Sequence, residues 1–359
     1  MRKALTTLAL IAVAAGSAGA QGLGSLGTIF GPQYVNYKIG SGAGEKTVTQ
    51  LSFPVAFILP ITDRLSFDLS ASYADSRVAT DGKETSKITG LTDTQLRVNY
   101  TLGDNQAAFT LGVNAPTGMY KVPDKQQDAA GQIGSNFLLY PVSSMGSGSA
   151  VTGGLALAYT FGEWNLGLGG SYRYSSPFDA YQVQTSVLRF EPGSEARLRV
   201  GVDRAVGDGR ISLAATYSTF TADKVDSTSF ATGARMLGQA GITMPTAYGD
   251  FSVSAWDLYR AAGQQIGSQA PWENISNVNV ALGFTWGSVY VQPSLEGRAW
   301  MRDYEKAGAV GTAGVRFRIG TGAFTWNPAL SYSMGTVYPG GATSIDVQGL
   351  RATMLFRYQ

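Results

Sequence analysis

Segments of about ten residues in which apolar and polar side chains alternate recur along this chain, and they constrain its fold more than any other feature. In Ala150–Phe161 the apolar residues, including Leu155 and Leu157, occupy every second position, with small or polar residues between them. The turn Gly162-Glu163 leads into a second arm with the same alternation. Since successive side chains of a strand point to opposite faces, each arm has one apolar face and one small or polar face.

The length of these arms and their aromatic residues are typical of a membrane barrel. About ten residues in a tilted strand can cross a bilayer. Phe161 and Trp164 flank the turn of this hairpin, and Tyr172 and Tyr174 lie at its far end. Outer-membrane barrels place aromatic girdles at these two levels. The hairpin therefore indicates a transmembrane β-barrel.

The rest of the chain repeats this unit, with connections that alternate in length. The predicted strands are Pro32–Ile39, Thr47–Leu59, Leu65–Tyr73, Leu91–Leu102, Ala107–Asn114, Ala150–Phe161, Trp164–Tyr174, Glu195–Ala205, Ile211–Phe220, Ala234–Met244, Asp250–Arg260, Ile275–Trp286, Val289–Trp300, Gly308–Ile319, Ala323–Met334 and Ser344–Tyr358. Turns such as Gly287-Ser288 are short, whereas Ala74–Thr89, Ala115–Ser149 and Ser175–Ser194 are long and polar. The pattern predicts an all-β fold, a transmembrane antiparallel β-barrel of about 16 strands with 14 as the alternative, short periplasmic turns and long extracellular loops.

Two of these strands set specific expectations for the outer face of the barrel. Pro32–Ile39 has Val35, Tyr37 and Ile39 on its apolar face, which in such a barrel contacts lipid. In Asp250–Arg260 the alternation puts Asp257 on the lipid side unless a β-bulge shifts the register.

A soluble sandwich of two sheets is the alternative architecture, because its strands also alternate between a buried and a solvated face. The chain has too many paired arms for their apolar faces to share one small interior. Charged residues make up only 14% of the 359 residues, and 46 are Gly. Strands do not alternate with helical periods, which argues against an α/β enzyme. The barrel is the better interpretation.

Residues 1–20 have the features of a secretory signal peptide. Arg2 and Lys3 precede the apolar run Ala4–Ala15, and Ala18-Gly19-Ala20 provides a cleavage site. We expect Gln21–Gly31 to form a short N-terminal periplasmic tail or a partial plug, and residues 32–359 to form the barrel in the bacterial outer membrane. Removal of residues 1–20 leaves equal numbers of basic and acidic residues, so the charge gives no reason to expect nucleic acid as a partner.

The chain contains neither Cys nor His, which removes several kinds of chemistry. Disulfides, Cys or His metal sites and Ser-His-Asp catalysis are excluded. We therefore expect no enzyme activity, cofactor or metal site. The last strand ends LRATMLFRYQ, with aromatic residues near the terminus, which resembles the signal that the barrel-assembly machinery reads.

The charged residues on the polar face of the strands are the best candidates for function in the lumen. They are Asp68, Asp93, Arg97, Arg173, Arg197, Arg199, Asp203, Arg235, Glu296, Arg298, Arg316, Arg318 and Arg351. Arg pairs well with carboxylates in fixed geometry, so these residues could form ion pairs that stiffen the wall. Alternatively, because Arg outnumbers the acids, they could form a constriction that favours anions.

The connection Ala115–Ser149 is the longest, and loops of this length without secondary structure of their own are uncommon unless they are functional or disordered. Its apolar run Phe137, Leu138, Leu139 and Tyr140 (FLLY) should pack into the barrel mouth, on the outer leaflet or on a partner. We expect packing at the mouth, where these residues would act as a gate.

Three short segments follow one another in a recognisable order: GLTDTQLRVNY at Gly90–Tyr100, LGVNAPTG at Leu111–Gly118 and SMGSGSA at Ser144–Ala150, before LALAYTF. This order resembles the outer-membrane transporter group that includes the meta-pathway phenol-degradation proteins and, more distantly, the FadL-like transporters. The resemblance implies a channel for hydrophobic or aromatic compounds.

Together these observations predict an outer-membrane channel or transporter for small hydrophobic or amphipathic molecules, aromatic or anionic ones included, by passive diffusion. The alternative is a structural or adhesive barrel that displays binding loops. The expected partners are outer-membrane lipid, a small-molecule solute and, during biogenesis, the barrel-assembly machinery. The oligomeric state stays open.

Overall fold

The computed structural model describes residues 27–42, 44–103, 106–183, 186–265, 268–339 and 343–358. The predicted signal peptide, residues 1–20, lies outside the described residues. No helix in the described ranges is both long enough and apolar enough to cross a membrane.

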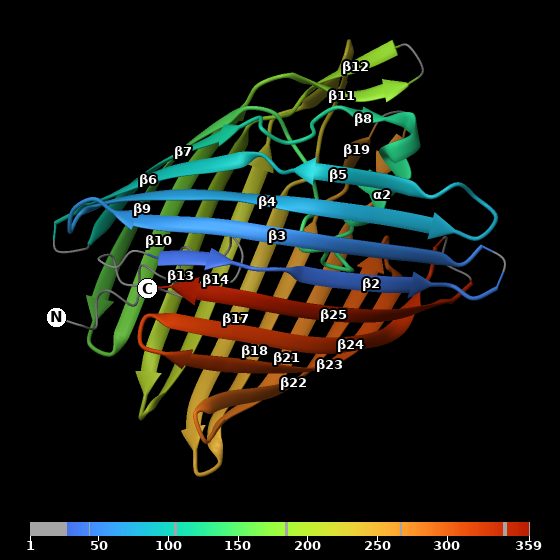
Figure 1. Cartoon of the computed structure of the whole chain (residues 1–359). Helices are drawn as coiled ribbons and strands as arrows, with labels where there is room; N and C mark the ends of the chain where they lie inside the picture. Colours follow the sequence, from blue (N-terminus) through green and yellow to red (C-terminus); the bar gives the residue numbers. More distant parts are fainter. Residues whose placement is uncertain are drawn as a thin grey trace.

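The chain forms a closed antiparallel barrel of 16 wall strands, as the sequence predicts (Figure 1). Two wall positions consist of two strands end to end: β1 (Gly27–Phe30) with β2 (Gln33–Ile39), and β5 (Ser86–Leu91) with β6 (Thr94–Leu102). The other wall strands are β3 (Lys46–Pro60), β4 (Leu65–Thr80), β7 (Ala107–Ala115), β9 (Ala150–Phe161), β10 (Trp164–Ser175), β13 (Glu195–Val206), β14 (Gly209–Phe220), β17 (Arg235–Thr246), β18 (Gly249–Arg260), β21 (Glu273–Trp286), β22 (Val289–Arg302), β23 (Glu305–Thr321), β24 (Phe324–Val337) and β25 (Ile345–Tyr358). Pairing of β25 with β1 and β2 closes the ring.

Short elements occupy the long connections at one end of the barrel. The connection between β7 and β9 contains β8 (Val122–Pro123), the 3-10 helix η1 (Asp124–Gln126) and the helix α2 (Gln127–Ile133). A separate sheet joins β8 to β11 (Phe178–Val183), β12 (Ser186–Glu191), β15 (Asp223–Val225) and β16 (Thr228–Phe230). A last hairpin consists of β19 (Gly263–Gln265) and β20 (Ser268–Ala270). The predicted loop Ser175–Ser194 is thus partly a hairpin, β11–β12, because it pairs with β8 and β15.

The outer surface of the wall is apolar, and the alternation predicted it correctly for most strands. Leu155, for example, is 48% exposed on the outer side, across from Phe109 of β7. Outward aromatic residues lie near both ends of the strands. Those at the short-turn end include Phe161, Trp164, Trp286, Phe324 and Tyr358, and those at the other end include Tyr172, Tyr174, Tyr217 and Tyr259.

The first wall position differs from the sequence prediction in two ways. Gly27–Phe30, predicted as part of a tail or partial plug, instead forms β1 and pairs with β25 and β3. A Cβ atom at Gly31 would lie 2.1 Å from the Met354 carbonyl oxygen, so only glycine fits at this point. The register against β25 is the same before and after it, which turns Phe30 and Tyr34 outward.

The apolar face of β2 consequently faces the lumen rather than lipid, contrary to the prediction. Val35 is 0% exposed and Tyr37 is 4% exposed, and both belong to an internal apolar cluster. The alternation is present in this strand, but its apolar side packs against a loop inside the barrel. Periodicity alone gives the two faces and not which of them is inside.

The prediction of a loop over Ala74–Thr89 is also wrong, because β4 continues to Thr80 and β5 pairs with it. In this extension the inward residues are apolar and the outward residues are charged, which is the reverse of the rest of the wall. Val78 and Ile88 face inward and are buried, whereas Asp75 on the outer side forms ion pairs with Arg77 and Lys87. A charged outer face belongs in water, so this part of the wall stands above the apolar belt.

The strand β18 carries its acidic residue on the outer face, as the alternation predicts in the absence of a bulge. Its pairings with β17 and β21 run without a register shift. The Asp257 carboxylate accepts hydrogen bonds from Asn274 Nδ2 at 2.7 Å and Ser276 Oγ at 2.6 Å. These two neighbours on β21 satisfy the charge locally.

Candidate functional site: a loop held inside the barrel

The connection between β7 and β9, residues 116–149, is folded into the barrel, and we call it the lumenal loop. Its helix α2 lies against the inner face of β4 and β5. The Ser86 hydroxyl of β5 donates to the Lys125 carbonyl at 2.7 Å and accepts the Ala129 amide N–H at 3.2 Å. Ala129 and Ile133 of the helix are buried. The helix is therefore docked on the wall by its small apolar face.

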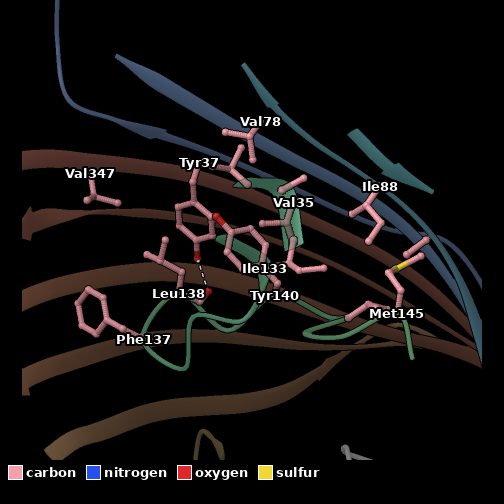
Figure 2. Close-up of a cluster of buried hydrophobic side chains, with 14 of the residues drawn as sticks. Val35, Tyr37, Val78, Ile88, Ile133, Phe137, Leu138, Tyr140, Met145 and Val347 are labelled. Carbon is pink, nitrogen blue, oxygen red and sulfur yellow. Dashed lines mark hydrogen bonds between the residues drawn. The ribbon is translucent and has the colours of Figure 1, made fainter. Parts of the chain in front are cut away.

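Phe137, Leu138 and Tyr140 of the FLLY run form the apolar centre of the lumenal loop (Figure 2), whereas Leu139 is 36% exposed. Phe137 is 2% exposed and its ring stacks on Trp300 of β22, with ring centroids 5.4 Å apart. The Tyr140 ring meets Tyr37 edge to face at 5.6 Å. Burial raises the pKa of the Tyr140 hydroxyl, which stays neutral. The structure places Phe137, Leu138 and Tyr140 inside the barrel, against its wall.

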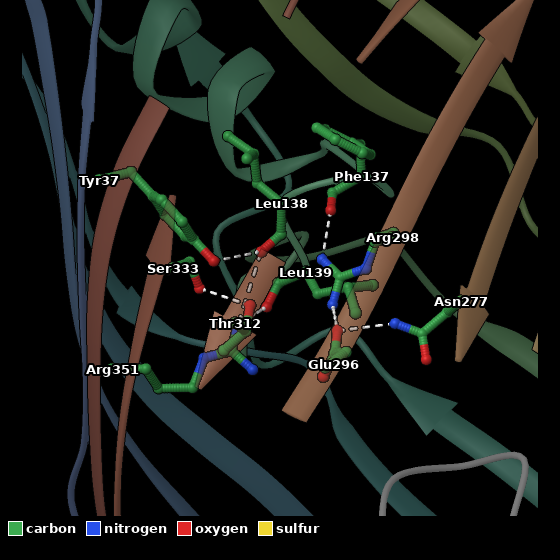
Figure 3. Close-up of polar contacts among 10 residues, drawn as sticks. All are labelled: Tyr37, Phe137, Leu138, Leu139, Asn277, Glu296, Arg298, Thr312, Ser333 and Arg351. Carbon is green, nitrogen blue, oxygen red and sulfur yellow. Dashed lines mark hydrogen bonds and ion pairs between the residues drawn. The ribbon is translucent and has the colours of Figure 1, made fainter. Parts of the chain in front are cut away.

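Three consecutive carbonyl groups of the run point to donors on the wall (Figure 3). Arg298 Nη1 donates to the Phe137 oxygen at 2.5 Å, and Arg351 Nη2 donates to the Leu139 oxygen at 2.5 Å. The Leu138 oxygen accepts from the Tyr37 hydroxyl at 3.1 Å. Leu139 has a positive φ of 53°, which is unusual for a residue with a side chain and persists only where its surroundings enforce it.

A further wall residue holds the next part of the loop with both the donor and the acceptor of its side-chain amide. Gln50 of β3 donates from Nε2 to the Val142 carbonyl at 2.8 Å, and its Oε1 accepts the Val142 N–H at 2.9 Å. Gln50 also donates to Ser76 Oγ at 2.9 Å. A buried amide whose groups are all paired in this way fixes one position of the backbone.

Asp93, between β5 and β6, ties the two ends of the lumenal loop together. Its Oδ1 accepts the Gly118 N–H at 3.1 Å. Its Oδ2 accepts the Ser147 N–H at 2.6 Å and Asn114 Nδ2 at 2.9 Å. Hydrogen bonds to a charged acceptor are the stronger kind in proteins. This predicted lumen residue thus lies at the base of the loop.

Backbone segments cross closely around this carboxylate. A Cβ atom at Gly118 would lie 2.1 Å from the Met145 carbonyl oxygen and 2.6 Å from the Asp93 nitrogen. The Thr117 hydroxyl accepts the Thr94 N–H at 2.9 Å. The three segments that carry the family resemblance therefore meet at one place, where the wall strand is interrupted and the loop leaves and returns.

We predict that Asp93→Ala releases both ends of the lumenal loop. The loss of hydrogen bonds to a charged acceptor should cost about 2 kcal/mol locally. Residues 119–145 should become accessible to protease while the barrel keeps its heat-modifiable migration on gels. Asp81→Ala, in an exposed turn, is the control and should leave the loop protected. If both variants resist protease equally, Asp93 does not anchor the loop.

The other predicted charges lie on the inner wall, and most have polar partners. Glu296 pairs with Arg298 and accepts from Asn277 Nδ2 at 2.7 Å (Figure 3). The remaining contacts are Asp68 with Asn99 at 2.9 Å and Arg97 at 4.0 Å, Arg197 with Glu195 at 2.8 Å, Arg199 with Gln239 at 3.1 Å and Asp203 with Arg210 at 2.7 Å. Arg173 lies opposite Glu195 in the pairing of β10 with β13.

Two predicted arginines, Arg316 and Arg318, lie on the inner face of β23 toward the short-turn end. Neither forms an ion pair with a described residue. The Arg318 guanidinium lies over the Tyr290 ring, 4.6 Å from its centroid. In the described part of the chain there is no group of His, Cys, Asp and Glu residues that could hold a metal ion.

Sequence reasoning missed the wall residues that hold the loop without carrying charge. Tyr37 and Gln50 gave no signal, because each lies more than 90 positions from its partner in the loop. The helix α2, in contrast, has a recognisable signal in the sequence. Ala129, Ala130 and Ile133 recur at helical spacing within residues predicted as irregular.

Comparison with known proteins shows likeness only in fold. No protein family model matches the chain, and no curated protein matches it in sequence. The solved structures that resemble it include an outer-membrane channel from Pseudomonas putida F1 (14% identity, TM-score 0.42, 96% of this chain and 98% of that one) and Pseudomonas putida OprB (13%, 0.47, 92% and 94%). CdiB from Acinetobacter baumannii matches with 9% identity and a TM-score of 0.50, over 93% of this chain and 61% of that one.

Proposed function

We propose that this protein is an outer-membrane channel for small amphipathic molecules, aromatic or anionic ones included, and that the lumenal loop restricts passage through it. The observation that carries the proposal is the FLLY run seated inside a closed barrel by Arg298, Arg351 and Tyr37. A 16-stranded barrel without such a loop encloses an aqueous channel. The resemblance of residues 90–175 to outer-membrane transporters supports the same function.

The outer surface supports the membrane location. An apolar belt with aromatic residues at both levels suits a bilayer, and a closed barrel leaves no unpaired strand edge in lipid. Both described chain ends, at Gly27 and Tyr358, lie at the short-turn end, which in bacterial barrels of this kind is periplasmic.

The inner wall supports a route beside the loop. The lumenal loop covers the inner faces of β2 to β5 and of β21 to β25, where its apolar contacts lie. Across from it, β9 to β17 present small inward residues such as Gly154, Gly169 and Gly201. Because the same strands also carry inward charges such as Arg173 and Arg199, a path beside the docked loop would be narrow and polar on this side.

The test of the proposal is conductance of the full chain in planar bilayers. We expect steady ion-conducting events, and we expect the double variant Arg316→Ala/Arg318→Ala to shift selectivity toward cations, because arginines without ion pairs attract anions into a pore. Reversal potentials in a salt gradient measure the shift. Arg204→Ala, at an outward position beside Glu163, is the matched control. A folded protein that never conducts would contradict the channel and favour the adhesive barrel.

A further inference from the structure

One horizontal row of the inner wall gathers cations at the loop end of the barrel. Through the pairings of β13, β14, β17, β18, β21 and β22, the residues that lie side by side are Arg197, Ser218, Arg235, Arg260, Glu273 and Arg302. We call Arg197, Arg235, Arg260 and Arg302 the arginine row. It lies at the rim, since Arg235 begins β17 and Arg260 ends β18. The row therefore lies at the entrance on the loop side, below the connections that carry β15, β16, β19 and β20.

The centre of this row holds more positive charge than its own acids neutralise. Arg197 pairs with Glu195 at 2.8 Å, and Arg260 pairs with Glu273 at 3.1 Å. Arg235 lies directly opposite Arg260. No ion pair joins Arg235 to a described residue, and its guanidinium lies 5.0 Å from the centroid of the Phe220 ring. Like charges directly opposite each other on neighbouring strands repel and destabilise a sheet. An anion bound between the two guanidinium groups would offset that repulsion.

The row immediately below is apolar over β17, β18 and β21, whereas on β13 the same row holds Arg199. Two positions further into the barrel on the same face, Leu237, Leu258 and Ile275 lie side by side, and we call them the apolar row. Leu237 and Leu258 are half-buried. Ile275 is covered by the internal cluster that contains Phe137, so this row leads directly to the lumenal loop. On this part of the wall the arginine row therefore lies at the rim, with the apolar row next to it on the lumen side.

We propose that the arginine row and the apolar row form a capture site for a small carboxylate with an apolar body. The carboxylate would bind the Arg235 and Arg260 guanidinium groups, whose forked donors suit two oxygens. The body would lie on Leu237 and Leu258. This site would give the proposed channel a class of solute, a small carboxylate with an apolar body. Its role in transport rests on that proposed function.

Calorimetric binding to the purified full chain in detergent tests the site. The probes are cyclohexanecarboxylate, its uncharged amide and acetate. We expect the first to bind most tightly, because the amide lacks the charge and acetate lacks the apolar body. Arg235→Gln should weaken binding of cyclohexanecarboxylate by about tenfold or more, since a charge-assisted hydrogen bond is lost. Arg235→Lys keeps the charge without the forked donors, so its affinity for cyclohexanecarboxylate should lie between those of the wild type and Arg235→Gln.

Arg204→Gln is the matched control, because it removes an arginine on the outer face at the short-turn end, outside the lumen, and should leave binding unchanged. Arg235→Gln should fold at least as well as the wild type, since it removes a like-charge contact. Equal binding by Arg235→Gln and wild type, or by the amide and the carboxylate, would overturn the site.

Binding in detergent requires no ion flux, so the two proposals fail separately. A protein that binds the carboxylate but does not conduct would end the channel and leave the site. A protein that conducts but does not bind it would end the site and leave the channel.

Discussion

Leu155→Arg should prevent most of the protein from folding into membranes. Leu155 lies on the outer face near the middle of β9, between Phe109 of β7 and Gly170 of β10. A cation at the midplane of the lipid face costs about 2–4 kcal/mol in barrels of this kind. Leu282→Arg, on the outer face of β21, should have a similar but smaller effect because Leu282 lies nearer the end of its strand. The folded fraction on heat-modifiable gels, with unfolding midpoints in urea, measures the loss.

The same substitution on the inner face provides the control. Asn279 of β21 lies inward, directly opposite Glu296 of β22, so Asn279→Arg places the new charge in the lumen beside an acid. Thr152→Arg on β9 also points inward and lies opposite Arg173, so it should be tolerated, though less well than Asn279→Arg. If inward and outward arginines impair folding equally, the apolar belt does not face lipid.

The sequence was sufficient for the barrel because a period of two repeats in every wall strand. Its failures share one cause, which is that periodicity reports an apolar face without saying what covers it. The alternation predicts Val35 and Tyr37 on the outer face, but the lumenal loop covers them and they face inward. The upper parts of β4 and β5 carry charged and polar outer residues, a composition that predicts a loop.

The candidate site was predictable in its parts but not in its contacts. The alternation placed Arg298 and Arg351 inside, and the length of the connection singled out the FLLY run. Their meeting could not be inferred, because Arg298 lies 161 positions from Phe137 and Arg351 lies 212 from Leu139. The arginine row likewise depends on register across six strands, and a slip of one residue would turn a side chain to the other face.

Removal of the lumenal loop should raise conductance several-fold, because an open 16-stranded barrel holds a wide aqueous channel. The loop can be excised at its base, where a Cβ atom at Gly146 would lie 2.9 Å from the Met119 carbonyl carbon. Replacing residues 120–144 by Gly-Ser-Gly keeps Asp93 with Gly118 and Ser147. The wall strands pair with one another without the loop, so the barrel should stay closed.

A matched excision elsewhere separates loss of the lumenal loop from loss of any loop. The hairpin β19–β20 lies at the rim, where Gln264 exchanges hydrogen bonds with Ala231. Replacing residues 263–270 by Gly-Ser should leave conductance near that of the wild type.

Single-channel conductance of the wild type and these two excision variants, in the same bilayer and salt, is the most direct test of the proposal that the lumenal loop restricts a channel. We expect small events from the wild type and from the β19–β20 excision, and events several-fold larger from the excision of residues 120–144. Equal conductance from all three folded proteins would contradict it.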